Sequence, residues 1–175
     1  MKIERVESIL AGNSQIVRVI TDNGLIGVGQ SACWGYLEAT DAVVKKFADY
    51  LVGKDPLDIE HHWQYMYRMG PFRGSVISGA VSAVDIALWD IKGKVSGLPV
   101  YDLLGGSYRN LVRLYCNAWF PNCYTPEDYA LAAKKNLVAN GHSACKLDPF
   151  IEMAPYHQMY QDGFISQQGE QLGYD

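Results

Sequence analysis

Positive charge and long hydrophobic runs are both scarce in this sequence of 175 residues. The net charge is −4, with 15 lysines and arginines against 19 acidic residues, so no broad basic surface is available to neutralise a nucleic-acid backbone. No apolar stretch approaches membrane-spanning length, and residues 1–10 alternate charged and apolar types where a secretory signal needs a continuous apolar run. These absences favour a cytoplasmic protein that binds small molecules and other subunits, with neither nucleic acid nor membrane as a partner.

Cysteine is also sparse, with four residues in the chain: Cys33, Cys116, Cys123 and Cys145. They lie far apart or at C-x6-C spacing, which matches neither a zinc motif nor a redox motif. We therefore expect reduced thiols. Internal repeats and low-complexity tracts are absent too, and 49% hydrophobic residues is a typical globular composition.

Apolar residues alternate with polar or charged residues from residue 2 to residue 30, and turn-forming residues interrupt this pattern at 12–13 and 22–24. This pattern predicts a three-stranded antiparallel meander. One face must be covered, because an isolated meander of this size is marginal in water. The residues expected on that face are Ile3, Val6, Ile16 and Val19, or their neighbours.

Helices are predicted over residues 37–51 and 57–69, and a third begins near Ser75. The third carries alanines at spacings of three and four, which allow another backbone to approach closely. Lys92 and Lys94 suit its negative C-terminal end, and Gly97 is expected to form a left-handed cap, with Pro99 just beyond.

The pattern after residue 110 changes to a strand at 111–119, a helix from Thr125 to about Ala139, and a second strand at 143–150. Strand, helix and strand in this order predict a parallel crossover unit. Residues 151–169 are expected to form a long loop, and the final residues resemble the start of a further helix, so truncation is the simplest interpretation of the chain end.

The run AVSAVDIALWDIKGK from Ala80 to Lys94, with GLPV at 97–100 and LLGG at 103–106, resembles the pattern of the mandelate racemase and muconate lactonizing enzyme family of the enolase superfamily. The resemblance implies an α+β N-terminal capping domain, a three-stranded antiparallel meander plus helices, at residues 1–110. It also implies that residues 111–175 form the first two β/α units of a truncated (β/α)7β TIM-like barrel.

The resemblance further implies a Mg²⁺-dependent enzyme that removes the proton next to a carboxylate, most often to dehydrate an acid sugar, and that assembles as a homo-oligomer when full length. Its reactive residues lie at the C-terminal ends of barrel strands. The family binds Mg²⁺ through acidic residues of the third to fifth strands. The chain ends after the second, so the metal ligands lie beyond residue 175, and no metal ligand is assigned within this sequence.

Two charged residues, Lys146 and Asp148, share one face of the predicted strand SACKLDPF, because side chains alternate along a strand. The position resembles the family's Lys-x-Lys element, in which Lys146 matches the first lysine and Asp148 replaces the second. This replacement favours the acid-sugar dehydratase branch. The ammonium of Lys146 is expected to stabilise charge that develops on the substrate. The alternative is a structural ion pair between Lys146 and Asp148.

Substrate specificity in this family comes from loops of the cap. Trp34 and Tyr36 lie in the loop SACWGY, and Arg73 lies between two glycines before the third helix. We predict that all three bind substrate, with Arg73 directed to a carboxylate. The alternatives are that Trp34 is buried at the boundary of the cap and that Arg73 is a surface or interface residue.

A second line of residues on the third helix is separate from the alanines and contains Ser78, Ser82, Asp85, Trp89 and Lys92. Asp85 is expected to hold the cap to the barrel through an arginine rather than to act in catalysis. His61 and His62 are adjacent on a predicted helix and point in different directions, so they cannot chelate one ion together. His142 and His157 lack acidic partners at ligand spacing, and all four histidines are predicted to be structural or solvated.

Three functional hypotheses remain open from the sequence. The first is the N-terminal part of an acid-sugar dehydratase, inactive as an isolated fragment. The second is a racemase or epimerase of hydroxy acids in the same family, which needs a competent base on each face of the substrate. The third is a non-catalytic binding or assembly module.

Overall fold

The computed structural model describes residues 1–31, 33 and 35–147. The chain divides into two units, Met1–Tyr108 and Arg109–Asp175, and each is described separately. Within the described residues, no helix is both long enough and apolar enough to cross a membrane.

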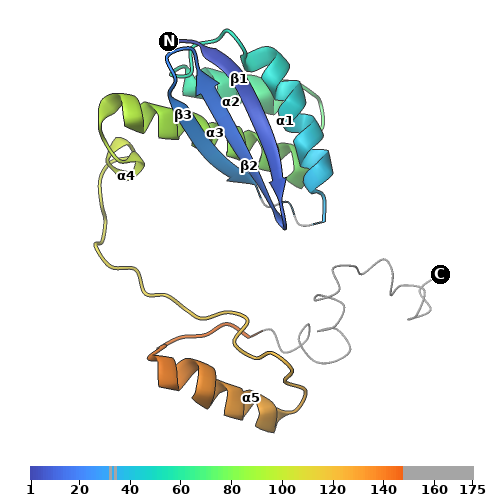
Figure 1. Cartoon of the computed structure of the whole chain (residues 1–175), viewed down its shortest axis with the longest axis vertical. Coiled ribbons are helices and arrows are strands. Elements are labelled where there is room, and N and C mark those ends of the chain that lie inside the picture. The colour runs from blue at the N-terminus through green and yellow to red at the C-terminus, as the bar shows by residue number, and fades with distance from the viewer. Residues whose placement is uncertain (32, 34, 148–175) are drawn as a thin grey trace, which may run out of the picture. The chain divides into compact units, whose positions relative to one another are not determined.

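The first unit contains the predicted antiparallel meander, formed by β1 (Ile3–Ala11), β2 (Ser14–Thr21) and β3 (Ile26–Ser31) in the order β1-β2-β3. Gly12 and Gly24 adopt positive φ angles in the two connecting turns, as the sequence predicts for turn formers. Three helices cover one side of this sheet (Figure 1): α1 (Leu37–Leu51), α2 (Ile59–Arg68) and α3 (Ser75–Ser96).

The covered face differs from strict alternation at one point. A register shift between Ile3 and Arg5 inserts an irregularity in β1, so Ile3 and Val6 both face the helices although they are three residues apart. On β2 the alternating residues Gln15, Val17 and Val19 are buried, followed by Ile20 and Thr21, and Ile16 is only half-buried. Val17 and Val19 belong to the core under the helices. The expectation for Ile3, Val6 and Val19 is thus confirmed, and at Ile16 the buried position belongs to its neighbour Val17.

Helix α3 packs directly on β3 through its alanines. Gly27 and Gly29 have no side chains at the contact, and a Cβ atom added to them would lie 2.0 Å from the carbonyl oxygen of Ala87 and 1.8 Å from that of Ala83, respectively. Ala83 and Ala87 are fully buried. The predicted close approach of another backbone to the alanine stripe is therefore confirmed, and the backbone is that of β3.

The helix ends follow local chemistry. Helix α2 begins two residues later than predicted, because Asp55 folds residues 55–58 into a turn in which its side chain accepts a hydrogen bond from the Leu57 amide (3.0 Å). Helix α3 ends at Ser96, and Gly97, with a φ of 66°, forms the predicted left-handed cap. A short helix, α4 (Val100–Leu103), follows.

The second unit contains α5 (Pro126–Ala132), which continues as one π-helical turn, η1 (Ala133–Leu137), and one 3-10 turn, η2 (Val138–Asn140). Thr125 and Asp128 form a reciprocal capping box at the start of α5. The helix predicted from Thr125 to about Ala139 is therefore present, with a wider and then a tighter winding at its end.

The two predicted strands of this unit meet in a single parallel bridge between Cys116 and Cys145. Parallel pairing agrees with the prediction, but within the described residues the pair does not extend into a ladder. Parallel strands are stable when neighbouring strands and helices cover them. The first strand segment lacks such a cover within the described residues, because Leu111 and Leu114 are 88% and 74% exposed. A small core of Trp119, Phe120, Cys123 and Leu137 joins the helix to the first strand segment.

Candidate functional site

Two cap loops that carry predicted substrate-binding residues emerge at the same end of the first unit. Gly79, near the start of α3, approaches the Ser31 side chain and the Cys33 Cβ, so the beginning of α3 lies against the segment that follows β3. The glycine-flanked loop at 70–74 leads into this end of α3, and Tyr36 lies directly before the first residue of α1.

Tyr36 has a backbone held by hydrogen bonds and an exposed ring. Its amide donates to the Cys33 carbonyl (3.0 Å), and its own carbonyl accepts hydrogen bonds from the amide and hydroxyl of Thr40 in the first turn of α1. The Tyr36 side chain is 63% exposed. The Tyr36 ring is therefore accessible to a ligand from solvent. Trp34, the other residue predicted on this loop, lies outside the described residues.

Arg73 is held locally rather than directed to Tyr36. Its guanidinium donates to the Pro71 carbonyl (2.9 Å) and lies 4.7 Å from the centre of the Tyr67 ring. No hydrogen bond or ring contact joins Arg73 to Tyr36 within the described part of the chain. The side chain is exposed, so a carboxylate ligand can reach the guanidinium from solvent.

Lys146 follows the parallel bridge immediately, and its backbone is held by two hydrogen bonds. The Lys146 amide donates to the Cys116 carbonyl (2.9 Å), and the Trp119 indole N–H donates to the Lys146 carbonyl (2.9 Å). Asn136 donates in turn to the Trp119 carbonyl (2.6 Å). The Lys146 side chain is exposed, and its predicted neighbour Asp148 lies outside the described residues.

The sequence interpretation did not identify Trp119 and Asn136 as residues that position Lys146. Hydrophobic periodicity does not reveal a side-chain-to-backbone hydrogen bond between distant segments. The sequence does contain one indication of these hydrogen bonds. Trp119 and Asn136 carry polar groups in the predicted strand and helix, and a buried indole N–H normally requires an acceptor.

Asp85 is half-buried on α3, and burial together with the nearby Glu60 carboxylate raises the pKa of Asp85 above its usual value. No arginine in the described part of the chain forms an ion pair with it. The ammonium of Lys92 instead lies 5.4 Å from the Trp89 ring centre. The role of Asp85 in holding the cap to the barrel stays a prediction.

His62 is buried and structural, as predicted. One ring nitrogen, Nε2, lies 2.7 Å from the Asp55 carbonyl oxygen, which can only accept, so Nε2 carries the proton. The other nitrogen, Nδ1, lies 3.0 Å from the Tyr50 hydroxyl, from which it accepts a hydrogen bond when the ring is neutral. Within the described residues, no three His, Cys, Asp or Glu side chains gather as a metal site. His157 lies outside those residues.

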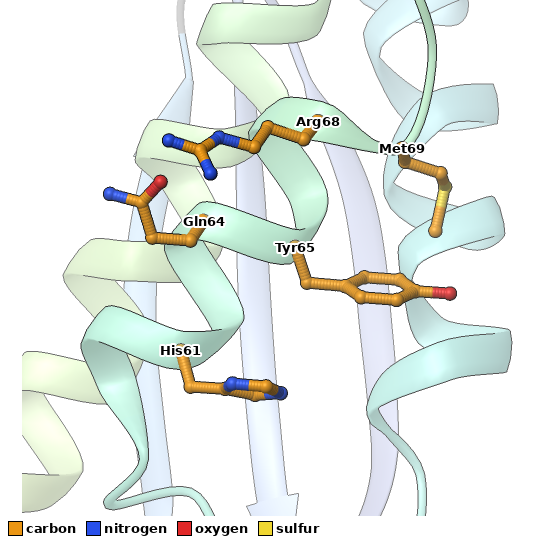
Figure 2. A pocket seen from close by; sticks show the side chains of 5 residues that line it. All are labelled: His61, Gln64, Tyr65, Arg68 and Met69. Atoms are coloured by element: carbon orange, nitrogen blue, oxygen red, sulfur yellow. The ribbon is translucent and has the colours of Figure 1, made fainter.

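An open groove of about 460 Å³ lies along α2 and is lined by His61, Gln64, Tyr65, Arg68 and Met69. Figure 2 shows that Tyr65 and His61 extend to one side of the helix, and Gln64 and Arg68 to the other. Tyr65 stacks on Tyr50 of α1, with ring centres 3.7 Å apart. None of the described residues that the sequence assigned to substrate lines this groove.

Comparisons with known proteins agree with this architecture. The family model of the mandelate racemase / muconate lactonizing enzyme N-terminal domain matches residues 6–105. A D-galactonate dehydratase of Ralstonia pickettii is 41% identical over 155 residues, which cover 87% of this chain and 40% of that protein. A crystal structure of an enolase superfamily member from Salmonella Typhimurium has a TM-score of 0.80 at 32% identity, covering 89% of this chain and 43% of that chain.

An enolase from Pantoea ananatis, crystallised with bound D-gluconate and Mg, has a TM-score of 0.70 at 32% identity, covering 83% of this chain and 36% of that chain. The chain thus spans less than half the length of these relatives. The antiparallel meander, the helices on one of its faces and the sequence match all describe the same N-terminal domain. This chain therefore belongs to the mandelate racemase / muconate lactonizing enzyme family.

Proposed function

We propose that this chain is the N-terminal part of an acid-sugar dehydratase, which removes the proton next to a substrate carboxylate and expels a hydroxyl group as water. The observation that carries the proposal is the similarity to D-galactonate dehydratases, which extends over 87% of the chain and so beyond the cap into the second unit. We further propose that residues 1–110 form the cap and residues 111–175 begin the barrel.

Lys146 is proposed as a catalytic residue. Its backbone is anchored to the first strand segment by the Cys116 carbonyl and by Trp119, while its ammonium remains exposed. An ammonium held on such a support stabilises negative charge as it develops on a substrate carboxylate. Asp148, which lies outside the described residues, is proposed to act together with Lys146, because the two share one face in the alternation of the sequence.

The cap residues Trp34, Tyr36 and Arg73 are proposed to select the substrate. An acid sugar presents hydroxyl groups and a carboxylate, which suit an exposed phenol and a guanidinium. The Arg73 bond to the Pro71 carbonyl is intraloop and solvent-exposed, so its exchange for a carboxylate needs no disruption of the core.

Mg²⁺, which the family resemblance implies, does not fit the described residues, because they contain no cluster of three acidic, histidine or cysteine side chains. We therefore assign no residue of this chain to the metal and derive no catalytic step from it. The relatives are more than twice as long, and we propose that the metal ligands and the base belong to the part of such a protein that corresponds to their remaining length.

The test is a screen of acid sugars with a protein of the relatives' length. This chain is joined in frame to the segment that follows it in its gene or, where the gene ends at codon 175, to the corresponding segment of the Ralstonia pickettii relative. The expected product from D-galactonate or a related acid is a 2-keto-3-deoxy acid, which is about 18 Da lighter than its substrate because one water molecule is lost. An epimer of unchanged mass would instead identify a racemase or epimerase, and the isolated chain serves as the inactive control.

A further inference from the structure

Cys116 and Cys145 lie far apart in the sequence but directly opposite each other in the structure. They form the parallel bridge of the second unit, in which the Cys116 amide donates to the Ala144 carbonyl (3.0 Å) and the Lys146 amide donates to the Cys116 carbonyl (2.9 Å). Residues that face each other on neighbouring strands direct their side chains to the same side of the sheet. Their two thiols therefore project from the same face.

Side-chain contacts on both sides of this bridge hold its register. Arg113 donates to the Ser143 carbonyl (2.6 Å) and to the Ser143 hydroxyl (3.2 Å). Beyond the bridge, the Trp119 indole donates to the Lys146 carbonyl (2.9 Å). A slip of one strand past the other would break all of these hydrogen bonds, so the two cysteines stay paired with each other.

The separation and exposure of the pair suit a disulfide. Neighbouring strands lie about 4.8 Å apart, within the range of Cα separations that disulfides span, about 4.4–6.8 Å. Cys145 is exposed and Cys116 is half-buried, and both are free thiols. Formation of the bond requires the two Cβ atoms to approach to about 3.8 Å, which draws the strands together and makes the bond easy to reduce.

We propose that Cys116 and Cys145 form a reversible disulfide by exchange with a small disulfide such as oxidised glutathione. The Cys145 thiolate attacks one glutathione sulfur, the glutathione S–S bond breaks, and one glutathione thiolate leaves. The Cys116 thiolate then attacks the Cys145 sulfur of the mixed disulfide and displaces the second glutathione. The two cysteines are oxidised, oxidised glutathione is reduced to two glutathiones, and these take up the two protons.

Arg113 and Lys146 favour this oxidant. Both lie close to Cys145 along the strand pair and carry positive charge, whereas oxidised glutathione carries a net negative charge from its carboxylates. Cys123 is a matched internal control, because it belongs to the same unit and is buried in the small core with Trp119 and Phe120.

The experiment exposes the folded 175-residue chain to increasing ratios of oxidised to reduced glutathione, blocks the remaining thiols with N-ethylmaleimide, and maps disulfides by mass spectrometry without reduction. Digestion with trypsin and chymotrypsin separates Cys116 from Cys123, since Trp119 lies between them. We expect the Cys116–Cys145 link to exceed the Cys123–Cys145 link at least tenfold, to disappear on addition of dithiothreitol, and to lose this preference in 8 M urea. Equal amounts of the two links in the folded chain would overturn the proposal.

A second measurement uses phenylarsine oxide, which binds two neighbouring thiols without requiring the strands to approach. We expect one equivalent to bind the folded chain, binding to persist in Cys33→Ser and Cys123→Ser, and binding to be lost in Cys145→Ser. A persistent glutathione adduct on Cys145 with no link to Cys116, or arsenical binding that survives Cys145→Ser, would contradict the pairing.

Discussion

Replacement of Gly29 by alanine adds a single methyl group at the contact between β3 and α3. The new Cβ atom would lie 1.8 Å from the Ala83 carbonyl oxygen, whereas real Cβ atoms essentially never approach closer than 3.0 Å. The obstructing atom belongs to the helix backbone, so no side-chain rotation relieves the clash. The helix must move away from the strand by at least 3.0 − 1.8 = 1.2 Å.

The cost follows from the loss of packing across this contact. A gap of about 0.5–1 Å already forfeits about a quarter to a half of each dispersion contact, and overpacking by a methylene group costs about 1–3 kcal/mol where the surroundings can adjust. Because Ala83 and Ala87 are fully buried at the centre of the core, we expect Gly29→Ala to lower the free energy of unfolding by about 3 kcal/mol or more.

The assay is urea unfolding followed by circular dichroism at 222 nm, which reports mainly on helix. Gly70→Ala is the matched control, because a Cβ atom at Gly70 meets nothing within 4 Å and Gly70 does not have a positive φ. We expect the control to change the free energy of unfolding by about 0.5 kcal/mol or less. Equal unfolding midpoints for Gly29→Ala and Gly70→Ala would refute the close approach of β3 to α3.

The remaining predictions concern four other positions. His62→Gln should lower the free energy of unfolding by about 2–4 kcal/mol in urea melts, because it disturbs two buried hydrogen bonds, to the Tyr50 hydroxyl and the Asp55 carbonyl. Asp85→Asn should stabilise the isolated chain at neutral pH, because folding raises the pKa of Asp85. The stabilisation that the protonated Asp85 carboxyl gives to the folded state is present below the unfolded pKa and is lost as pH rises through the folded pKa. Thermal melts from pH 3 to pH 7 should therefore depend less on pH in the variant than in the parent chain. Thr125→Ala should cost about 1 kcal/mol through loss of the capping box, read as reduced helicity of the second unit. Lys146→Met in the protein of the relatives' length should lower kcat for acid-sugar dehydration by about 10²–10³-fold while urea midpoints stay unchanged.

The fold of the first unit was largely predictable because its signals are local. Turn formers at 12–13 and 22–24, a glycine cap at Gly97 and small residues at helical spacing each act within a few residues of their position. The exception on β1 is also physical. The irregularity between Ile3 and Arg5 reverses the alternation, and alternation alone cannot show where such an irregularity lies.

The candidate site was less predictable because its contacts join distant segments. The sequence placed Lys146 on a strand, but the support from Trp119 and Cys116 arises only when the parallel crossover brings the two strand segments together. Similarly, the spacing of the cysteines gave no sign that Cys116 and Cys145 face each other. Arg73 was correctly placed on a loop, yet its stacking on Tyr67 depends on the loop conformation.

The most direct test of the central claim is to follow the fate of the substrate proton next to the carboxylate. The protein of the relatives' length is incubated in deuterated water with MgCl₂ and the acid sugar that the screen identifies, and the reaction is followed by proton NMR. Our account predicts loss of the signal of the proton next to the carboxylate and incorporation of deuterium at carbon 3 of the 2-keto-3-deoxy product, both slowed in Lys146→Met. Consumption of the acid with that proton retained would contradict proton removal as the step this family member performs.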